Sequence, residues 1–462
     1  MPPSLASFLT LGFIAFLFRR DFREKPNITG AIWIPTLWLL IITTRAVTTW
    51  LGMFGLSVGG SSLEEGSTID ALVYFGLIIA GLRVLAQRRV HLSEIIRNNR
   101  WLTIYLLYCF IAITWSDFPF VAFKRWIKEL GHPIMVLVLL TEPNFEESLT
   151  RLLKRCSYII APVSILWIKY YPEYGRGFSE WTGQAYNTGI TENKNSLGWD
   201  CLILCFFFVW HLLMTLRREK SKARRDELIL CIGFLAMISW LFSIADSKTP
   251  LVALFLSLAI LLFTGVRWVN RRLVGVYVLA AVAMIVTVEW TIGIYESALE
   301  ILGRNASLTE RTPLWAELRK WGDRNPVFGV GFESFWLGER RETIWETMKW
   351  APSQAHNGYL ETYINTGAVG LALLLCLIIA TYCKAHRALL HDFDFGRYRY
   401  AFLFAILIYN WTEASLYGLH PVWFMFFVLA IDYPRRRADR PQELAEPVHD
   451  PRTGPGLAPI QV

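Results

Sequence analysis

The 462-residue sequence is poor in charge, with 18% Asp, Glu, Lys and Arg against about 25% in an average soluble domain. This shortage excludes an ordinary soluble enzyme, and a hydrophobic fraction of 54% excludes a disordered chain. The apolar residues gather into runs of about 15 to 20, the length a helix needs to cross a hydrocarbon core of roughly 30 Å. The sequence therefore predicts an all-α polytopic membrane protein.

Several kinds of site and segment are also missing. The seven Cys residues lie in or beside apolar runs without the spacing of a zinc site or a disulfide framework. The segments predicted to be external contain no Asp-x-Asp pair and no carboxylate cluster, so a metal-bound nucleotide diphosphate is not expected. The chain start has no basic region, so we expect no cleaved signal peptide. We expect neither a metal nor another cofactor.

The apolar runs predict twelve to thirteen transmembrane helices, with ends good to about three residues. They lie near residues 4–18, 30–50, 69–86, 101–115, 126–141, 156–171, 199–216, 228–245, 250–266, 273–291, 358–382, 400–418 and 420–433.

Lys and Arg are distributed unevenly between the connecting segments. Alternate segments hold 28 of these residues, whereas the short segments between them hold seven. Because basic residues stay in the cytoplasm, residues 217–225 should face the cytoplasm, and residues 172–198 and 292–357 the opposite side. The net charge of +8 thus reports topology, and no nucleic-acid partner is expected.

Two hydrophilic segments interrupt the membrane pattern and divide the chain. The divisions are N-terminal helices 1–171, a first external loop 172–198, central helices 199–291, a large external loop 292–357, C-terminal helices 358–433, and a Pro-rich tail 434–462 that should be disordered.

The large loop should contain helices that lie at the membrane interface. It holds five Trp residues, whose amphipathic rings favour that position. Ser307 and Glu310 form a possible capping box, which predicts a short helix over 310–322. A spacing of four then places Arg311 and Trp315 on one helix face.

Several short motifs occur in the order typical of one family. In chain order, the first motif is Glu192-Asn193-Lys194-Asn195. It is followed by Arg311-x-x-x-Trp315 and by a Gly-x-Gly turn at 329–331. The last two motifs are His356-Asn357 and Gly367-x-x-Gly370. This ordered set, over roughly residues 170–420, resembles the O-antigen ligase and polymerase family of bacterial envelope glycan enzymes. Many members carry His immediately before the Lys-Asn pair, where this chain has Asn193. Within the family, the set looks most like polymerases of secreted acidic polysaccharides.

The resemblance implies a metal-independent glycosyltransferase in the bacterial inner membrane, with a site facing the periplasm. It would polymerise oligosaccharide repeat units linked to undecaprenyl diphosphate into exopolysaccharide or O-antigen. Its partners would be this lipid-linked oligosaccharide, the bilayer, and a flippase and a chain-length regulator of the same pathway.

Two other functions remain open. An O-antigen ligase would transfer the glycan to lipid A core instead of to another repeat unit. A flippase or transporter of the same lipids should show repeated halves and ionisable residues at the bilayer midplane. This chain concentrates its candidate groups in one external loop, which favours an enzyme.

His356 is the candidate catalytic histidine, because it is the only His in the two external loops. Imidazole titrates near neutrality and can accept or orient a hydroxyl proton. The alternative is a helix-start histidine bonded to the backbone beside Asn357.

The resemblance gives Arg311 the second catalytic role, holding the diphosphate leaving group. An arginine fork matches phosphate oxygens and stays charged. Arg304 or Arg176 would be a second cation, and Lys194 a third. Alternatively, Arg311 reaches lipid phosphates from the interface, and Lys194 is only solvated.

The other predicted substrate contacts are Glu192, Asn357 and Trp315. Glu192 could orient the acceptor or pair with an arginine, whereas Glu361 is expected to be structural. Glu413 is an ionisable residue in an apolar run, which makes it a functional candidate, or it is simply accessible to water.

Overall fold

The structure is a computed structural model, and it describes residues 1–56, 66–178, 183–292, 311–348 and 350–433. The helices of the N-terminal part are α1 (Pro3–Arg23), η1 (Gly30–Ile32), α2 (Trp33–Thr43), α3 (Val47–Met53), α4 (Thr68–Gln87), α5 (Leu92–Asn98), α6 (Arg100–Ile111), η2 (Ala112–Trp115), α7 (Pro119–Glu129), α8 (Gly131–Leu140), α9 (Phe145–Tyr170) and α10 (Pro172–Gly175). They are followed by β1 (Arg176–Phe178), β2 (Ala185–Asn187), α11 (Lys194–Arg217), α12 (Lys222–Ala245), α13 (Lys248–Phe263), η3 (Arg271–Leu273), α14 (Val274–Ile292), α16 (Arg311–Gly322), α17 (Gly338–Met348), α18 (Gly358–His391), α19 (Phe393–Thr412) and α20 (Pro421–Ala430).

The predicted all-α membrane fold is confirmed. Within the described residues, β1 and β2 are the only strands, and they form one short antiparallel hairpin. Four described helices are long and apolar enough to cross a membrane, namely α4, α11, α12 and α18. A fifth apolar stretch, 30–53, is bent by 71° at its break, and shorter apolar helices cover 100–115, 248–263 and 421–430. The total of twelve to thirteen spans stays a prediction.

Two of the predicted spans are each divided between two separate helices. The span expected at 30–50 breaks between α2 and α3, where Arg45 donates to the carbonyl oxygens of Thr191 at 3.0 Å and Tyr174 at 2.6 Å. The span expected at 126–141 divides between α7 and α8. There the Trp38 ring packs so closely that a Cβ at Gly131 would overlap it.

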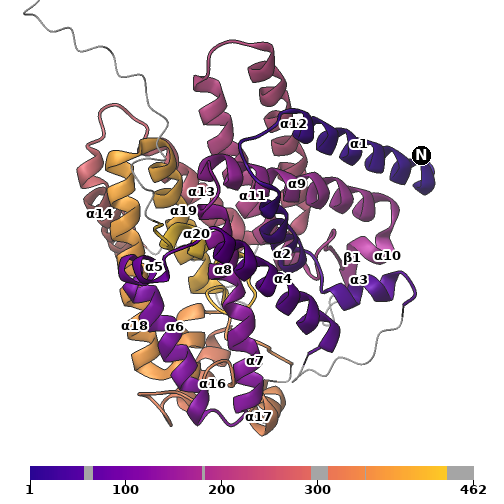
Figure 1. Cartoon of the computed structure of the whole chain (residues 1–462). Coiled ribbons are helices and arrows are strands. Elements are labelled where there is room, and N and C mark those ends of the chain that lie inside the picture. The colour runs from indigo at the N-terminus through magenta and orange to yellow at the C-terminus, as the bar shows by residue number, and fades with distance from the viewer. Residues whose placement is uncertain (57–65, 179–182, 293–310, 349, 434–462) are drawn as a thin grey trace, which may run out of the picture.

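The helices form a bundle with two distinct ends (Figure 1). The long α18 packs against α6 and α19, and α11 pairs with α12. In the view of Figure 1, α16 and α17 lie at the bottom of the bundle, and the turn between α11 and α12 lies at the top. The helix predicted over 310–322 is confirmed as α16.

The segment after α16 is locked to α18 by backbone hydrogen bonds. Gly367 interrupts α18 with a left-handed φ of 67°, which frees neighbouring amide groups for new partners. The amide of Ala368 donates to Pro326 at 2.8 Å, and the amide of Gly331 donates to Asn365 at 2.9 Å. A Cβ at Gly367 would overlap the Val327 carbonyl group. The Gly-x-Gly turn and the Gly-x-x-Gly of α18 are therefore two halves of one junction.

Because of this junction, we expect Gly367→Ala to lower the stability of the protein strongly. Strained φ and overpacking each cost about 1–3 kcal/mol, so the free energy of unfolding should fall by about 2–6 kcal/mol. Gly76→Ala is the matched control, because Gly76 lies within α4 and a Cβ there meets nothing within 4 Å. Thermal unfolding of both purified variants in detergent measures the difference. Equal stability of the two variants would contradict the proposed role of the junction.

Candidate active site

Arg311, His356 and Glu413 meet although they come from three distant segments of the chain. The Glu413 carboxylate lies 2.5 Å from Arg311 Nη2 through one oxygen and 2.8 Å from His356 Nδ1 through the other. Arg311 Nη1 also donates to the carbonyl oxygen of Thr412. Arg311 is the first residue of α16, His356 precedes α18, and Glu413 follows α19. One carboxylate thus joins the two predicted catalytic residues.

His356 is held in an unusual backbone conformation. Its φ of 48° lies in the left-handed region, which costs a non-glycine residue about 1–3 kcal/mol and persists only when surrounding contacts enforce it. Its ring nitrogen bonds the Glu413 carboxylate rather than a backbone group. The helix-start role belongs to Asn357, whose Oδ1 accepts the amides of Tyr359 at 3.0 Å and Leu360 at 3.1 Å. This capping contact occupies the Asn357 side-chain oxygen.

The contacts of Glu413 keep its carboxylate charged. Burial alone would raise its pKa, but the hydrogen bond to His356 and the charge of Arg311 outweigh burial and lower the pKa below its ordinary value. An ionised carboxylate only accepts hydrogen bonds, so Nδ1 of His356 carries the proton of this contact. Nε2 has no hydrogen-bond partner among the described residues. In the neutral ring, Nε2 is therefore free to accept a proton.

A second set of contacts fixes the residue before His356. Trp315 Nε1 donates to the Ala355 carbonyl oxygen at 2.8 Å, and the Ala355 amide donates to Glu361 at 2.7 Å. The other Glu361 oxygen accepts Trp336 Nε1 at 2.9 Å. Glu361 is 4% exposed and points inward, as expected for a structural residue. Trp315 and Glu361 thereby hold the backbone that carries the histidine.

The sequence missed the connecting role of Glu413. Its contacts to Arg311 and His356 span 102 and 57 residues, which no local spacing reveals. The available signal was an ionisable side chain in an apolar run. Asn410 in the same run also has a role, because its Oδ1 accepts the amides of Ser415 and Leu416, each at 3.1 Å, and shapes the turn that carries Glu413.

The remaining predicted residues do not touch this group in the described parts of the chain, and Arg304 lies outside the described residues. Arg176, in β1, donates to the Ile168 carbonyl oxygen at 3.0 Å. Lys194 begins α11, 3.9 Å from Asp246. Glu192 lies beside Arg45, and burial raises its pKa more than this arginine lowers it.

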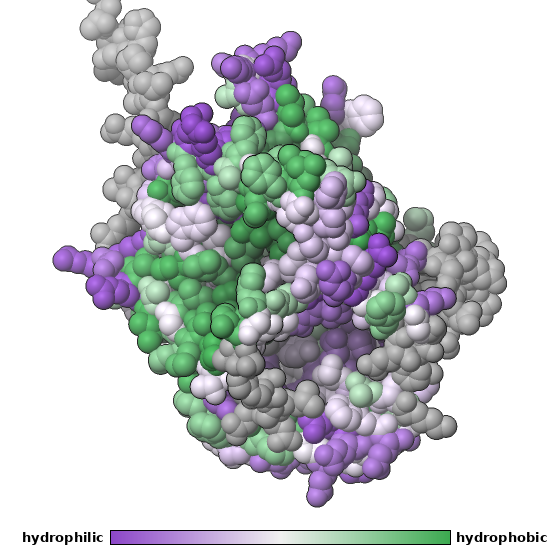
Figure 2. Space-filling view, turned by 90° about the vertical axis from the view of Figure 1, so that its right-hand side faces the viewer, coloured by the Kyte–Doolittle hydropathy of each residue, from purple (hydrophilic) through white to green (hydrophobic). Residues whose placement is uncertain are grey.

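The site lies at the end of the bundle at which Figure 1 places α16, whose first residue is Arg311. In the side view of Figure 2, hydrophobic residues gather mainly on the left of the drawn face, and a hollow opens in its lower half. A metal-like grouping of described residues, His211, Glu227 and Cys231, involves instead the far part of α11 and the start of α12.

Known proteins match part of the site and much of the chain. Residues 232–375 match the O-antigen ligase family model, a stretch that includes Arg311 and His356. The predicted resemblance to the O-antigen ligase family is confirmed. The chain is also 24% identical over 338 residues to the exopolysaccharide production protein ExoQ of Rhizobium meliloti (strain 1021), which covers 71% of this chain and 74% of that protein. Glu413 lies beyond the part that matches the O-antigen ligase model.

Glu413→Gln should destabilise the protein at neutral pH. Hydrogen bonds to charged groups contribute about 1.5–3 kcal/mol, so we expect a loss of about 2 kcal/mol in the free energy of unfolding. Because the pKa of Glu413 is lowered on folding, this contribution is full above its ordinary pKa. This stabilising contribution disappears as the pH falls through the lowered pKa of Glu413. Thermal unfolding of wild type and variant from pH 7 down to pH 3 should therefore show a difference that closes only in acid.

Glu317→Gln is the matched control, since Glu317 pairs on the same loop with Lys320, which is 72% exposed. Such a surface pair contributes about 0.2–1 kcal/mol. A Glu413→Gln effect no larger than that of the control would show that the central carboxylate is not a structural link.

Proposed function

We propose that the chain is a glycosyltransferase that polymerises oligosaccharide repeat units linked to undecaprenyl diphosphate, at the periplasmic face of the bacterial inner membrane. The family match and the similarity to an exopolysaccharide production protein support this reaction class. The observation that carries the proposal is the contact of both Arg311 and His356 with Glu413. It combines a proton acceptor and a fixed cation in one site.

In the proposed reaction, a hydroxyl oxygen of the acceptor sugar attacks the anomeric carbon of the lipid-linked glycan. The bond between that carbon and the phosphate oxygen breaks, and undecaprenyl diphosphate leaves with the electron pair. Nε2 of His356 takes the hydroxyl proton, while Glu413 holds the opposite ring nitrogen and stabilises the charged imidazolium.

Arg311 is proposed to bind the diphosphate. A guanidinium group has five N–H donors, and the described contacts of Arg311 to Thr412 and Glu413 use two of them. The others can bind phosphate oxygens, on which negative charge grows as the glycosidic bond breaks. The resemblance implies no metal ion in this step.

The remaining predicted residues are proposed to contact more distant parts of a long substrate. Lys194 and Glu192 lie at the start of α11, whose Trp199 ring is 4.2 Å from the ring of His420. His420 follows Glu413 in the same connection between α19 and α20, so this end of α11 adjoins the site. Arg304 and Arg176 are proposed as further phosphate cations, Asn357 as a sugar contact, and Trp315 as a residue that both contacts the substrate and positions Ala355.

Deletion of the gene tests the function directly. A polymerase mutant should accumulate single repeat units on the lipid carrier at the periplasmic face and lose high-mass polymer. Long chains left on the carrier would indicate a ligase, and repeat units trapped on the cytoplasmic face would indicate a flippase. Chromatography and mass spectrometry of lipid-linked and secreted glycans distinguish these outcomes, and a plasmid copy of the gene should restore the polymer.

Point variants should separate the roles of the two residues. His356→Ala should leave donor binding nearly intact and lower turnover by about 10² to 10⁴, as expected for a positioned acid or base. Arg311→Ala should weaken both donor binding and turnover, and Arg311→Lys should recover little, because a point charge replaces a fork. Polymer formation and binding of the lipid-linked donor are measured on purified protein in nanodiscs.

Arg319→Ala is the matched control, because Arg319 is exposed on the same helix, α16. This variant should leave polymer formation and donor binding near the wild-type values. A folded His356→Ala protein with normal turnover would remove His356 from the mechanism.

A further inference from the structure

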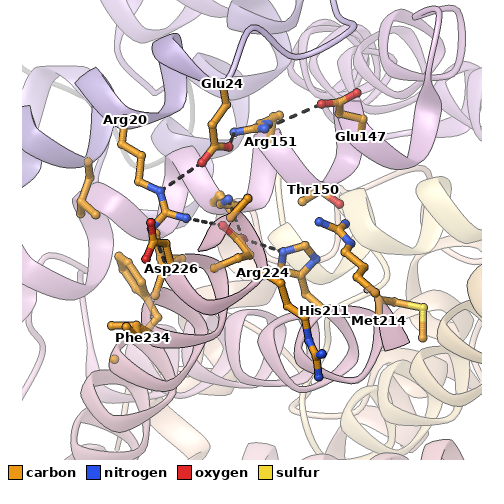
Figure 3. Close-up of a pocket in the computed structure, with 18 of the residues that line it drawn as sticks. Arg20, Glu24, Glu147, Thr150, Arg151, His211, Met214, Arg224, Asp226 and Phe234 are labelled. Carbon is orange, nitrogen blue, oxygen red and sulfur yellow. Dashed lines mark hydrogen bonds and ion pairs between the residues drawn. The ribbon is translucent and has the colours of Figure 1, made fainter. Parts of the chain in front are cut away.

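A large cavity lies at the other end of the bundle. It has a volume of about 1320 Å³ and is bounded by α1, the start of α9, the end of α11 and the start of α12 (Figure 3). The 24 residues of α11 span about 36 Å between this end and the end that packs on His420. The cavity is therefore separate from the His356 site. The positive-inside asymmetry predicts that this end faces the cytoplasm.

The inner wall of the cavity is a network of paired charges. Glu227 accepts from Arg20 at 2.7 Å through one oxygen and from Lys154 at 2.8 Å through the other. Arg151 lies 2.8 Å from Asp21 and 2.6 Å from Glu24. Figure 3 shows Arg20, Arg151 and their partners converging from different helices. These cations are already neutralised, so they shape the cavity without leaving a free charge.

Other arginines at the cavity are not neutralised. Arg19, Arg23 and Arg218 line the cavity and have no carboxylate partner among the described residues. Arg224, on α12, donates to the Leu216 carbonyl oxygen at 3.0 Å and likewise lacks a carboxylate. These four side chains come from α1 and from both sides of the α11–α12 turn. The whole lining holds seven basic and six acidic side chains, so these arginines give the mouth of the cavity a small excess of positive charge.

The same cavity has an apolar side that is open to the surroundings. Phe13 and Phe16, on α1, are 40% and 62% exposed, and Ile229, on α12, is 63% exposed. All three line the cavity. In a membrane-embedded helix such side chains contact lipid chains. The cavity therefore joins an arginine-rich end to a surface suited to hydrocarbon.

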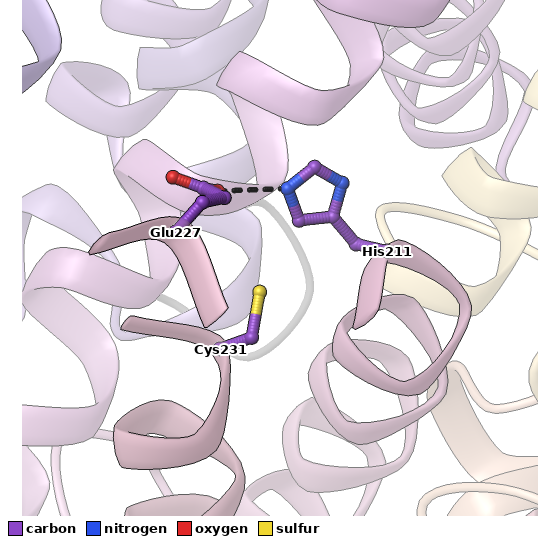
Figure 4. A group of neighbouring side chains, drawn as sticks. All are labelled: His211, Glu227 and Cys231. Atoms are coloured by element: carbon purple, nitrogen blue, oxygen red, sulfur yellow. Dashed lines mark hydrogen bonds and ion pairs between the residues drawn. The ribbon is translucent and has the colours of Figure 1, made fainter. Parts of the chain in front are cut away.

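The group around His211, the histidine of this cavity, is not suited to bind a metal ion. His211, Glu227 and Cys231 place their possible ligand atoms within 4.8 Å of one another (Figure 4). However, His211 Nε2 lies 2.8 Å from a Glu227 oxygen that also contacts Lys154. A metal ion on this carboxylate would face the positive charges of Lys154 and Arg20 at contact distance. The group is better explained as part of the paired inner wall.

We propose that this cavity binds an anionic phospholipid, with its phosphate headgroup among Arg19, Arg218 and Arg224 and its acyl chains against Phe13, Phe16 and Ile229. Arginine forks match phosphate oxygens, and basic pockets between membrane helices favour such headgroups. A free phosphate would use the arginines but leave the apolar side uncovered. The site is independent of the proposed glycosyltransferase reaction, and its test needs no activity measurement.

Binding of defined lipids to the full-length protein in detergent tests the proposal. Native mass spectrometry should show tighter binding of phosphatidylglycerol than of zwitterionic phosphatidylcholine. The Arg19→Gln, Arg218→Gln double variant should weaken phosphatidylglycerol binding about 25-fold, because each basic residue near a lipid phosphate contributes about fivefold. The Arg89→Gln, Arg272→Gln double variant is the charge-matched control, since both residues are exposed and line none of this cavity. It should bind like the wild type.

A second arm separates a lipid headgroup from a soluble phosphate. Glycerol phosphate should compete poorly with phosphatidylglycerol for binding. The Phe16→Ala, Ile229→Ala double variant should bind phosphatidylglycerol more weakly but glycerol phosphate as well as the wild type does. Equal binding of the two lipids, equal losses in the two arginine variants, or glycerol phosphate binding as tightly as the lipid would overturn the proposal. Thermal unfolding of each variant establishes that it is folded.

Discussion

The Glu413 carboxylate fixes three distant segments of the chain to one another. A buried charge is costly unless opposite charge and hydrogen bonds surround it, and Glu413 receives both from Arg311 and His356. Burial of this carboxylate therefore requires the start of α16, the start of α18 and the end of α19 to be in place together. The same contact that stabilises the fold sets the tautomer of the histidine. Structure and proposed chemistry depend on one ion.

The opposite end of the bundle uses a similar arrangement for a different purpose. Glu227 is also a buried carboxylate that contacts cations and a histidine, here Arg20, Lys154 and His211. At that end both carboxylate oxygens have cationic partners, and the histidine also bonds the carboxylate. The free positive charge comes from arginines outside the network. A closely related set of residues thus supports the proposed catalytic group at one end and the proposed lipid-binding cavity at the other.

Local patterns in the sequence predicted the elements that depend on local chemistry. The helix that carries Arg311 and Trp315 was predicted from capping and spacing. Trp315 contacts Ala355 beside His356, and Arg311 contacts Glu413, whose other oxygen bonds His356. Hydropathy could not predict the break at Arg45, because the carbonyl groups that the Arg45 side chain contacts lie 129 and 146 residues away in the sequence. The role of Glu413 could not be predicted for the same reason, since its contacts form only when α16 and α18 pack against the end of α19. The sequence showed Gly367 as a motif residue, but its close packing against Val327 could be recognised only in the folded structure.

The left-handed backbone of His356 restricts what evolution or an engineer can place there. Only glycine, asparagine, aspartate and a few similar residues adopt this conformation at low cost. In the proposed reaction, a residue at this position must satisfy the backbone and also present a basic nitrogen, and histidine, which is also enriched in this conformation, does both. Asparagine would keep the turn but lose the proton acceptor, whereas lysine or glutamate would strain the turn. The backbone and the proposed chemistry therefore favour the same residue independently, so we expect almost no substitution at position 356 to be neutral.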